Sequence, residues 1–104
     1  MPAPTLFTPT ALGSLSLRNR IVMSPMTRSR CEEANAPNDL MAEYYGQRAG
    51  AGLIIAEGTS PAPNGTGYSR TPGLWSARQV DAWRKVTDTV HARGGSIFVQ
   101  LMHT

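Results

Sequence analysis

The chain has 104 residues, of which 40% are apolar and 16% charged, and this size and composition suit one small globular domain. Its ten basic residues are spread along the sequence without a run, which disfavours a nucleic-acid-binding face. The single cysteine, Cys31, excludes an internal disulfide and fits a reducing, cytoplasmic setting.

Three further features are disfavoured by the sequence: a signal peptide, a membrane span and a metal site. The first residues have neither a basic nor an apolar region, so we expect no signal peptide. No apolar run approaches the roughly 18 residues of a membrane span, so we expect no membrane partner. The histidines, the cysteine and the acidic residues have no spacing typical of a metal site, and none is expected.

The first 24 residues predict a hairpin and then a strand. Residues 1–19 contain an alternation of leucine and serine beside Gly13, which is typical of a small β-hairpin. We expect this hairpin to be a lid on the lower end of a larger structure. Residues 20–24 are largely apolar and are followed by Pro25, which predicts a buried strand that ends at the proline.

The next element is a predicted helix over residues 39–49, with Asn38 as its N-cap. Apolar side chains recur at helical spacings and predict its buried face: Leu40, Met41, Tyr44, Tyr45 and Ala49. Gly50 and Gly52 are expected to end this helix.

A second helix is predicted after Ser76, which is its expected N-cap, with Gln79 three residues on as the partner in a capping box. The predicted apolar stripe is Val80, Trp83, Val86 and Val90. Gly94 and Gly95 are expected to end the helix.

Two more strands complete the pattern. Residues 53–59 begin with four apolar residues and read as a strand covered on both faces, and residues 96–103 read as the last strand. The loop over residues 60–75 is rich in glycine and proline, yet its aromatic residues favour an ordered loop. The order hairpin, β, α, β, α, β predicts a parallel α/β sheet. A doubly wound sheet and a (β/α)8 TIM barrel both fit, although no glycine-rich phosphate loop follows the first strand.

In a parallel α/β sheet, chemistry collects at the carboxyl ends of the strands. Here those ends carry Pro25, Met26 and Thr27, then Gly58, then Gln100. A hydroxyl, an amide and a glycine backbone are suited to the polar edge of a flat heterocycle. The same residue types also fit a structural role, with Thr27 capping a turn and Gln100 joining two strands.

Other polar residues are assigned structural roles. For Glu57 we expect a buried carboxylate paired with an arginine, with Arg28 as the candidate, rather than a general base. His91 is expected at a helix terminus, where the helix dipole favours it. His103 follows a strand end, and Cys31 is expected to be a loop thiol.

Taken together, these stretches resemble the N-terminal part of the old yellow enzyme family of flavin-dependent ene-reductases. Five segments carry the resemblance, in register and in order: residues 17–28, 42–49, 53–59, 67–76 and 98–103. The resemblance implies a (β/α)8 barrel that binds FMN non-covalently at its carboxyl end and accepts hydride from NADH or NADPH. It also implies ping-pong reduction of activated alkenes such as enones, nitroalkenes and maleimides.

The resemblance also implies roles for individual residues. Pro25, Met26 and Thr27 would line the flavin, with the Thr27 hydroxyl at its O4 edge. Gly58 would contact the flavin through its backbone, and Gln100 would bond its pyrimidine edge.

On the substrate side, the resemblance places Tyr68 and Met102, and Met102 stands where several relatives have a tryptophan.

No catalytic residue is expected in this chain, because the family's substrate-binding and proton-donating side chains come from later strands. A (β/α)8 barrel needs about 250 residues. We therefore expect residues 1–104 to be the N-terminal part of one FMN-binding barrel domain, with the remaining barrel segment as its partner. The alternative is a non-catalytic barrel fragment that only self-associates or assembles structurally.

Overall fold

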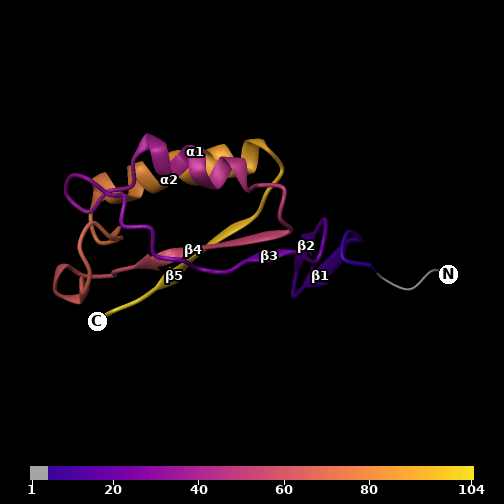
Figure 1. Ribbon diagram of the computed structural model, residues 1–104, viewed down its shortest axis with the longest axis horizontal. Helices are drawn as coiled ribbons and strands as arrows, with labels where there is room; N and C mark the ends of the chain where they lie inside the picture. Colours follow the sequence, from indigo (N-terminus) through magenta and orange to yellow (C-terminus); the bar gives the residue numbers. More distant parts are fainter. Residues whose placement is uncertain (1–4) are drawn as a thin grey trace.

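The computed structural model describes residues 5–104, so the first four residues of the predicted hairpin lie outside the described part. The described chain is elongated, with extents of 52 × 25 × 22 Å. Figure 1 shows the hairpin at one end of the molecule and the C-terminus at the other. In chain order the elements are β1 (Thr10–Leu12), β2 (Leu15–Leu17), β3 (Val22–Met23), α1 (Asp39–Gln47), β4 (Leu53–Thr59), the 3₁₀ turn η1 (Pro63–Gly65), α2 (Ala77–Ala92) and β5 (Ile97–Leu101).

Strands β3, β4 and β5 form one parallel sheet in that order, as the alternation of strands and helices predicts. Val22 pairs with Leu53, and Ile55 pairs with Phe98. The predicted bounds of β4 are confirmed, whereas β3 and β5 are shorter than predicted. Strand β3 stops at Met23, two residues before Pro25, which has no N–H to donate to a ladder.

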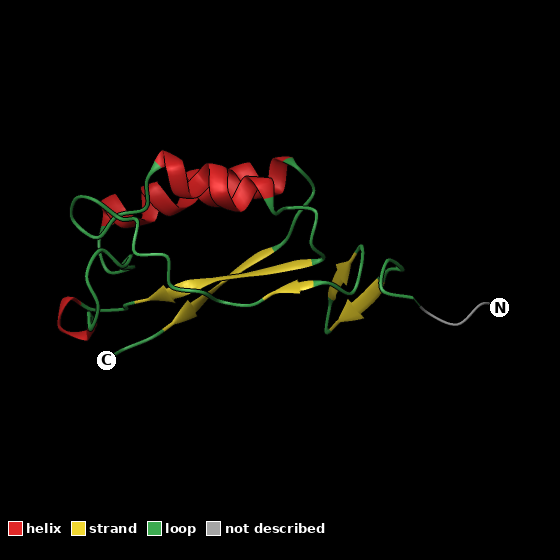
Figure 2. Ribbon diagram, in the orientation of Figure 1, coloured by secondary structure: helices red, strands yellow, loops and turns green. Residues whose placement is uncertain are grey.

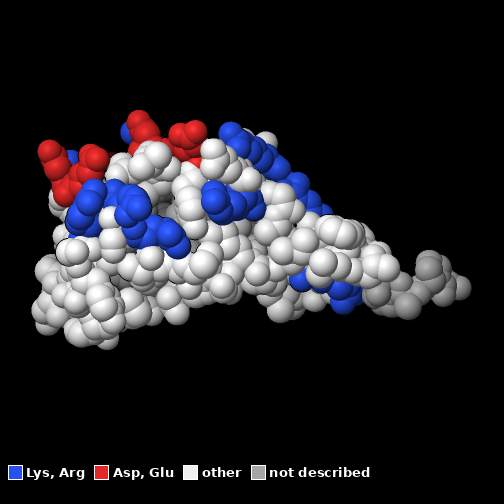
Figure 3. All heavy atoms as spheres, in the orientation of Figure 1, with Lys and Arg blue, Asp and Glu red and all other residues white. Residues whose placement is uncertain are grey.

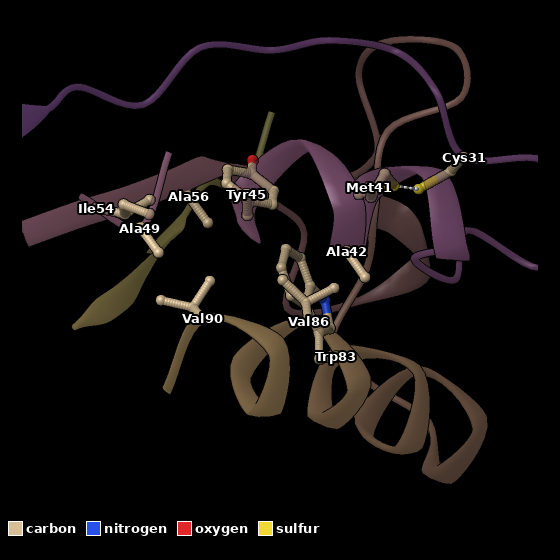
Figure 4. Close-up of a cluster of buried hydrophobic side chains, with 10 residues drawn as sticks. All are labelled: Cys31, Met41, Ala42, Tyr45, Ala49, Ile54, Ala56, Trp83, Val86 and Val90. Atoms are coloured by element: carbon tan, nitrogen blue, oxygen red, sulfur yellow. Dashed lines mark hydrogen bonds between the residues drawn. The ribbon is translucent and has the colours of Figure 1, made fainter. Parts of the chain in front are cut away.

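Both helices cover the same face of this sheet (Figure 2). They enclose a core in which an aromatic ring from each helix packs over the small and β-branched residues of the middle strand (Figure 4). The buried members of this core are Cys31, Met41, Ala42, Tyr45, Ala49, Ile54, Ala56, Trp83, Val86 and Val90. The core therefore lies between the sheet and the helix layer that covers one of its faces.

Helix α1 begins where predicted, because the Asn38 side chain accepts a hydrogen bond from the backbone N–H of Met41 at 3.0 Å. Its predicted end was wrong. Arg48 is the C-cap, and its N–H bonds to carbonyls of the last turn, so neither Gly50 nor Gly52 terminates the helix. Leu40 was also misplaced on the buried face and is exposed.

Helix α2 has the predicted capping box between Ser76 and Gln79, and it ends before Gly94, whose φ of +78° favours glycine. The predicted stripe was wrong in one position: Val80 is 43% exposed, and Gln79 is buried in its place. The Gln79 amide explains the difference. It donates to the carbonyl of Ala34 at 3.0 Å and accepts from the N–H of Trp75 at 2.7 Å.

The predicted hairpin forms from β1 and β2, which pair antiparallel around Gly13 with its φ of +60°. Arg18, directly after β2, donates to the carbonyl of Arg93 at 3.2 Å and also to that of Ala49. The hairpin is thereby tied to the carboxyl ends of both helices, at the amino end of the strands.

The sheet face away from the helices carries apolar side chains that nothing in the described chain covers. Val22 is 50% exposed and Phe98 is 53% exposed. In Figure 3 the charged side chains gather over the helix layer and the hairpin, while the region below them is uncharged in this view. Within residues 5–104, neither helix is long and apolar enough to cross a membrane.

Candidate functional site

The carboxyl ends of β3, β4 and β5 lie along one edge of the sheet because the three strands are parallel and adjacent. The backbone continues this pairing past the ends of the strands, where the N–H of Met102 donates to the carbonyl of Thr59 at 2.9 Å. Gly58 lies directly opposite Gln100 in the β4–β5 register. The segment with Pro25, Met26 and Thr27 follows β3, on the other side of β4. The topology therefore brings the three predicted groups of site residues to one edge.

The space beside the Cα atom of Gly58 is filled by neighbouring side chains. A Cβ at this position would come within 2.5 Å of the Met102 Cε atom and 3.5 Å of the Gln100 Oε1 atom. No side chain larger than hydrogen fits there without displacing Met102. Gly58 is buried beside the two side chains to which the resemblance assigns contacts with cofactor and substrate, Gln100 and Met102.

The residues after β3 are open to solvent. Met26 and Thr27 are exposed and Pro25 is half-buried. Within residues 5–104, neither the Thr27 hydroxyl nor the Gln100 amide has a protein hydrogen-bond partner. This observation does not favour the alternative in which Thr27 caps a turn and Gln100 joins strands. Both groups are free to bond a ligand.

Tyr68 is placed differently. It lies in the loop after η1, is 59% exposed, and its carbonyl accepts a hydrogen bond from the Thr71 hydroxyl at 3.1 Å. The loop is closed at its base by a bridge between Ser60 and Gly73. The described contacts do not join Tyr68 to Gly58, so its place on the substrate side stays a prediction.

Strand β4 contains a β-bulge beside the candidate site. Ala56 pairs with Val99 and Gly58 pairs with Gln100, so Glu57 is an extra residue with no partner on β5. The Tyr45 hydroxyl, on α1, accepts from the Glu57 N–H at 3.1 Å and donates to the Glu57 Oε2 atom at 2.5 Å. Tyr45 therefore bonds the N–H and one carboxylate oxygen of the bulged residue, while the buried Oε1 atom has no hydrogen-bond partner within residues 5–104.

The expected ion pair between Glu57 and Arg28 was wrong, since Tyr45 is the side-chain partner of Glu57 and no such ion pair forms within residues 5–104. Glu57 and Arg28 line the same cavity of about 310 Å³, together with residues of α1 such as Met41 and Tyr44. Glu57 is only 1% exposed, and burial raises the pKa of its carboxyl group, against the lowering effects of the Tyr45 hydrogen bond and of Arg28. Glu57 thus has the expected structural role, but its side-chain partner is Tyr45 instead of Arg28.

Tyr45 was predicted as an apolar helix position, and its hydroxyl was missed. A tyrosine on the buried face of a helix is a signal for a polar partner below it, because a buried hydroxyl is almost always bonded. The other polar residues are peripheral. His91 is in the last turn of α2, and His103 faces Asn64 at 3.3 Å.

Cys31 is buried, which raises the pKa of its thiol to about 12 and makes it a poor nucleophile. Within residues 5–104, no cluster of His, Cys, Asp and Glu could hold a metal ion.

Comparison with known proteins gives the same assignment over nearly the whole chain. Residues 5–104 match the model of the NADH:flavin oxidoreductase / NADH oxidase family. A chanoclavine-I aldehyde reductase of Penicillium roqueforti is 49% identical over 105 aligned residues, which are 99% of this chain but 28% of that protein.

Solved structures agree with the sequence comparison. Morphinone reductase in complex with tetrahydroNAD superposes with a TM-score of 0.93 at 52% identity, over 97% of this chain and 28% of that one. The old yellow enzyme homologue from Zymomonas mobilis superposes with a TM-score of 0.93 at 48% identity, over the same shares. The chain thus spans a little over a quarter of the length of these proteins and matches the N-terminal part of their TIM barrels. It belongs to the old yellow enzyme family of NADH:flavin oxidoreductases.

Proposed function

We propose that this chain supplies the first three strands of an FMN-dependent (β/α)8 barrel that takes hydride from NADH or NADPH and reduces activated C=C bonds by a ping-pong mechanism. Enones, nitroalkenes and maleimides are the proposed substrate classes. The observation that carries the proposal is the convergence of Thr27, Gly58 and Gln100 at the carboxyl edge of one parallel sheet. Membership of the family supports it.

The residues present fit FMN. Gly58 has no side chain to project toward a planar ring, and the Met102 side chain occupies the space that a Cβ would fill, with its Cε atom 2.5 Å from that position. The Thr27 hydroxyl can donate, and the Gln100 amide can both donate and accept. An isoalloxazine edge offers acceptors and a donor side by side, so the donor set is complementary to it.

In this proposal Pro25, Met26 and Thr27 line the flavin and Gln100 holds its pyrimidine edge. When bound, FMN supplies hydride transfer in both half-reactions. The Thr27 hydroxyl stabilises negative charge at the O4 edge of the reduced ring and so sets its potential.

The proposed substrate side lies beyond the flavin-lining residues. Tyr68 and Met102 face the substrate, and the thioether of Met102 shapes the pocket. No residue of this chain is proposed as the proton donor.

The proposed partner is the remaining barrel segment. It would cover the apolar sheet face on which Val22 and Phe98 are exposed, and it would pair with the free edges of β3 and β5. In that arrangement the β1–β2 hairpin closes the lower end of the barrel as a lid. Arg18, which ties the hairpin to both helix ends, supports this placement.

The test is FMN binding by the completed barrel, meaning this chain together with a remaining barrel segment. That segment can be taken from the Zymomonas mobilis homologue, whose N-terminal part this chain matches at 48% identity. We expect the joined protein to purify yellow, with flavin absorbance in a 1:1 ratio to protein, and the borrowed segment alone to purify colourless. A folded, joined protein that binds no FMN would contradict the proposal.

The alternative function is a non-catalytic barrel piece that self-associates. The exposed apolar face of the sheet favours it, because an uncovered sheet face and two open edges promote association. Size-exclusion chromatography with light scattering separates the two readings. The enzyme reading predicts one joined barrel that contains flavin. The alternative predicts flavin-free oligomers of this chain, which do not dissociate when the remaining segment is added.

A further inference from the structure

The bulge in β4 decides which residue faces the candidate site. Ile55 pairs with Phe98 on the uncovered face, and Ala56 pairs with Val99 on the helix face. A regular ladder would next place residue 57 opposite Gln100, because side chains alternate between faces. The slip of one residue places Gly58 there instead.

Without the slip, a glutamate side chain would occupy the position where a bare backbone is needed. A Cβ opposite Gln100 is already excluded by Met102, whose Cε atom lies 2.5 Å from that position. The carboxylate would also bring negative charge to the edge where Thr27 and Gln100 are proposed to bind a ring. The bulge therefore removes Glu57 from the site and supplies glycine.

A bulge leaves an unpaired N–H that must find another partner when it is buried. Here the partner is the hydroxyl of Tyr45, which bonds the N–H and the carboxylate of Glu57 together. Tyr45 and Glu57 are each 1% exposed, so water does not replace this contact. One side chain on α1 thus stabilises the strand geometry that the site requires.

We propose that Tyr45 is a positioning residue for the cofactor site, whose hydroxyl holds the Glu57 bulge and thereby presents the Gly58 backbone opposite Gln100. This inference rests on the proposed function, since it concerns the same FMN site. Tyr45 itself acts from the helix layer and touches neither cofactor nor substrate.

The variant that tests it is Tyr45→Phe in the completed barrel. We expect its dissociation constant for FMN, measured by quenching of free FMN fluorescence, to rise about tenfold, because a buried N–H loses its acceptor whenever the bulge forms. The position of the bound flavin's visible absorbance band should shift as well.

The matched control is Tyr44→Phe. It removes the neighbouring hydroxyl, which has no hydrogen bond within residues 5–104. It keeps the Tyr44 ring, whose centroid lies 5.1 Å from that of Tyr45 and which stacks with Arg48. We expect FMN affinity to be unchanged. A merely structural role for Tyr45 would lower the melting temperature of Tyr45→Phe and leave the FMN affinity and absorbance band of the folded fraction unchanged. That result would overturn the proposal.

A second measurement needs no variant and covers the case in which Tyr45→Phe does not fold. In the flavin-free completed barrel, the Glu57 amide should exchange its hydrogen as slowly as that of Ala56, because Tyr45 holds the bulge before FMN arrives. Fast exchange at Glu57 that becomes slow only with FMN would overturn the proposal. If the barrel binds no FMN at all, the proposed function fails, while slow exchange would still show that Tyr45 holds the bulge.

Discussion

Gly58 and Gln100 face each other across β4 and β5, and the Gln100 Oε1 atom lies 3.5 Å from where a Cβ on Gly58 would be. The Met102 Cε atom occupies the same space, 2.5 Å from that Cβ position. The three residues come from two adjacent strand ends, so their arrangement is fixed by backbone pairing and not by a mobile loop. This is the rigid part of the proposed FMN site.

Gly58→Ala should therefore weaken FMN binding in the completed barrel by at least about tenfold, because the new methyl group displaces Met102 or the ring. The measurement is titration with FMN by fluorescence quenching. Gly50→Ala is the matched control, since a Cβ at Gly50 meets nothing within 4 Å. Equal FMN affinity in the two variants would remove the role assigned to the Gly58 backbone.

Thr27→Ala should lower the midpoint potential of the bound flavin by about 30 mV, which corresponds to about 1.4 kcal/mol for a two-electron couple. The reason is the loss of a donor to the reduced ring, where negative charge develops. Thr27→Ser keeps the hydroxyl and should keep the potential. The role is disproved if the alanine variant has an unchanged potential and unchanged rates of both half-reactions.

Gln79→Ala should lower the free energy of unfolding of the completed barrel by about 2–3 kcal/mol. The truncation leaves the part-buried Trp75 N–H and Ala34 carbonyl without their side-chain partner. Val80→Ala, one residue on and 43% exposed, should cost less than about 1 kcal/mol. Urea unfolding of the two variants measures the difference, and equal costs would contradict the burial assigned to these positions.

The carboxyl of Glu57 predicts a dependence of stability on pH. Burial raises its pKa above the ordinary value of 4.5, so the folded state binds this proton more tightly than the unfolded state. This contribution to stability is present below pH 4.5 and is lost as pH rises through the folded-state pKa. Glu57→Gln removes the charge and keeps an acceptor for the Tyr45 hydroxyl.

The measurement is the free energy of unfolding of Glu57→Gln minus that of the wild type, at acid and at neutral pH. We expect this difference to shift in favour of the glutamine variant as the pH rises. Tyr45, Arg28 and Cys31 are the titratable or charged groups whose interactions with Glu57 enter the balance. A difference that stays constant across the range would show that Glu57 has the same proton affinity in both states.

Much of this fold is readable from local sequence signals. Asn38 and Ser76 are helix N-caps whose side chains bond nearby backbone N–H groups, and Gln79 completes the capping box of Ser76, so three or four residues suffice to identify each cap. The parallel sheet follows from the alternation of strands and helices. The convergence of Thr27, Gly58 and Gln100 then follows from the topology, because carboxyl ends of parallel strands share an edge.

The remaining features depend on contacts that no local signal records. The β4 bulge leaves no signal in a run of apolar residues that lacks alternation. The sequence therefore does not indicate on which face of the sheet the Glu57 side chain lies, nor whether Arg28 or Tyr45 is its partner. The burial of Gln79 in place of Val80 depends on the Ala34 carbonyl, which is 45 residues away in sequence. Hydrophobicity alone ranks these two residues in the wrong order.

The two faces of the sheet differ in where their partners come from. The helix face is covered by residues 31–90, all of which precede β5, and the opposite face has exposed apolar residues such as Val22 and Phe98. During synthesis from the N-terminus, the helix layer can therefore pack before any strand after β5 exists. Until then the opposite face of the sheet stays exposed to water. This sets an order of assembly in which the helix layer packs on the sheet first, and closure of the barrel then excludes water from the opposite face.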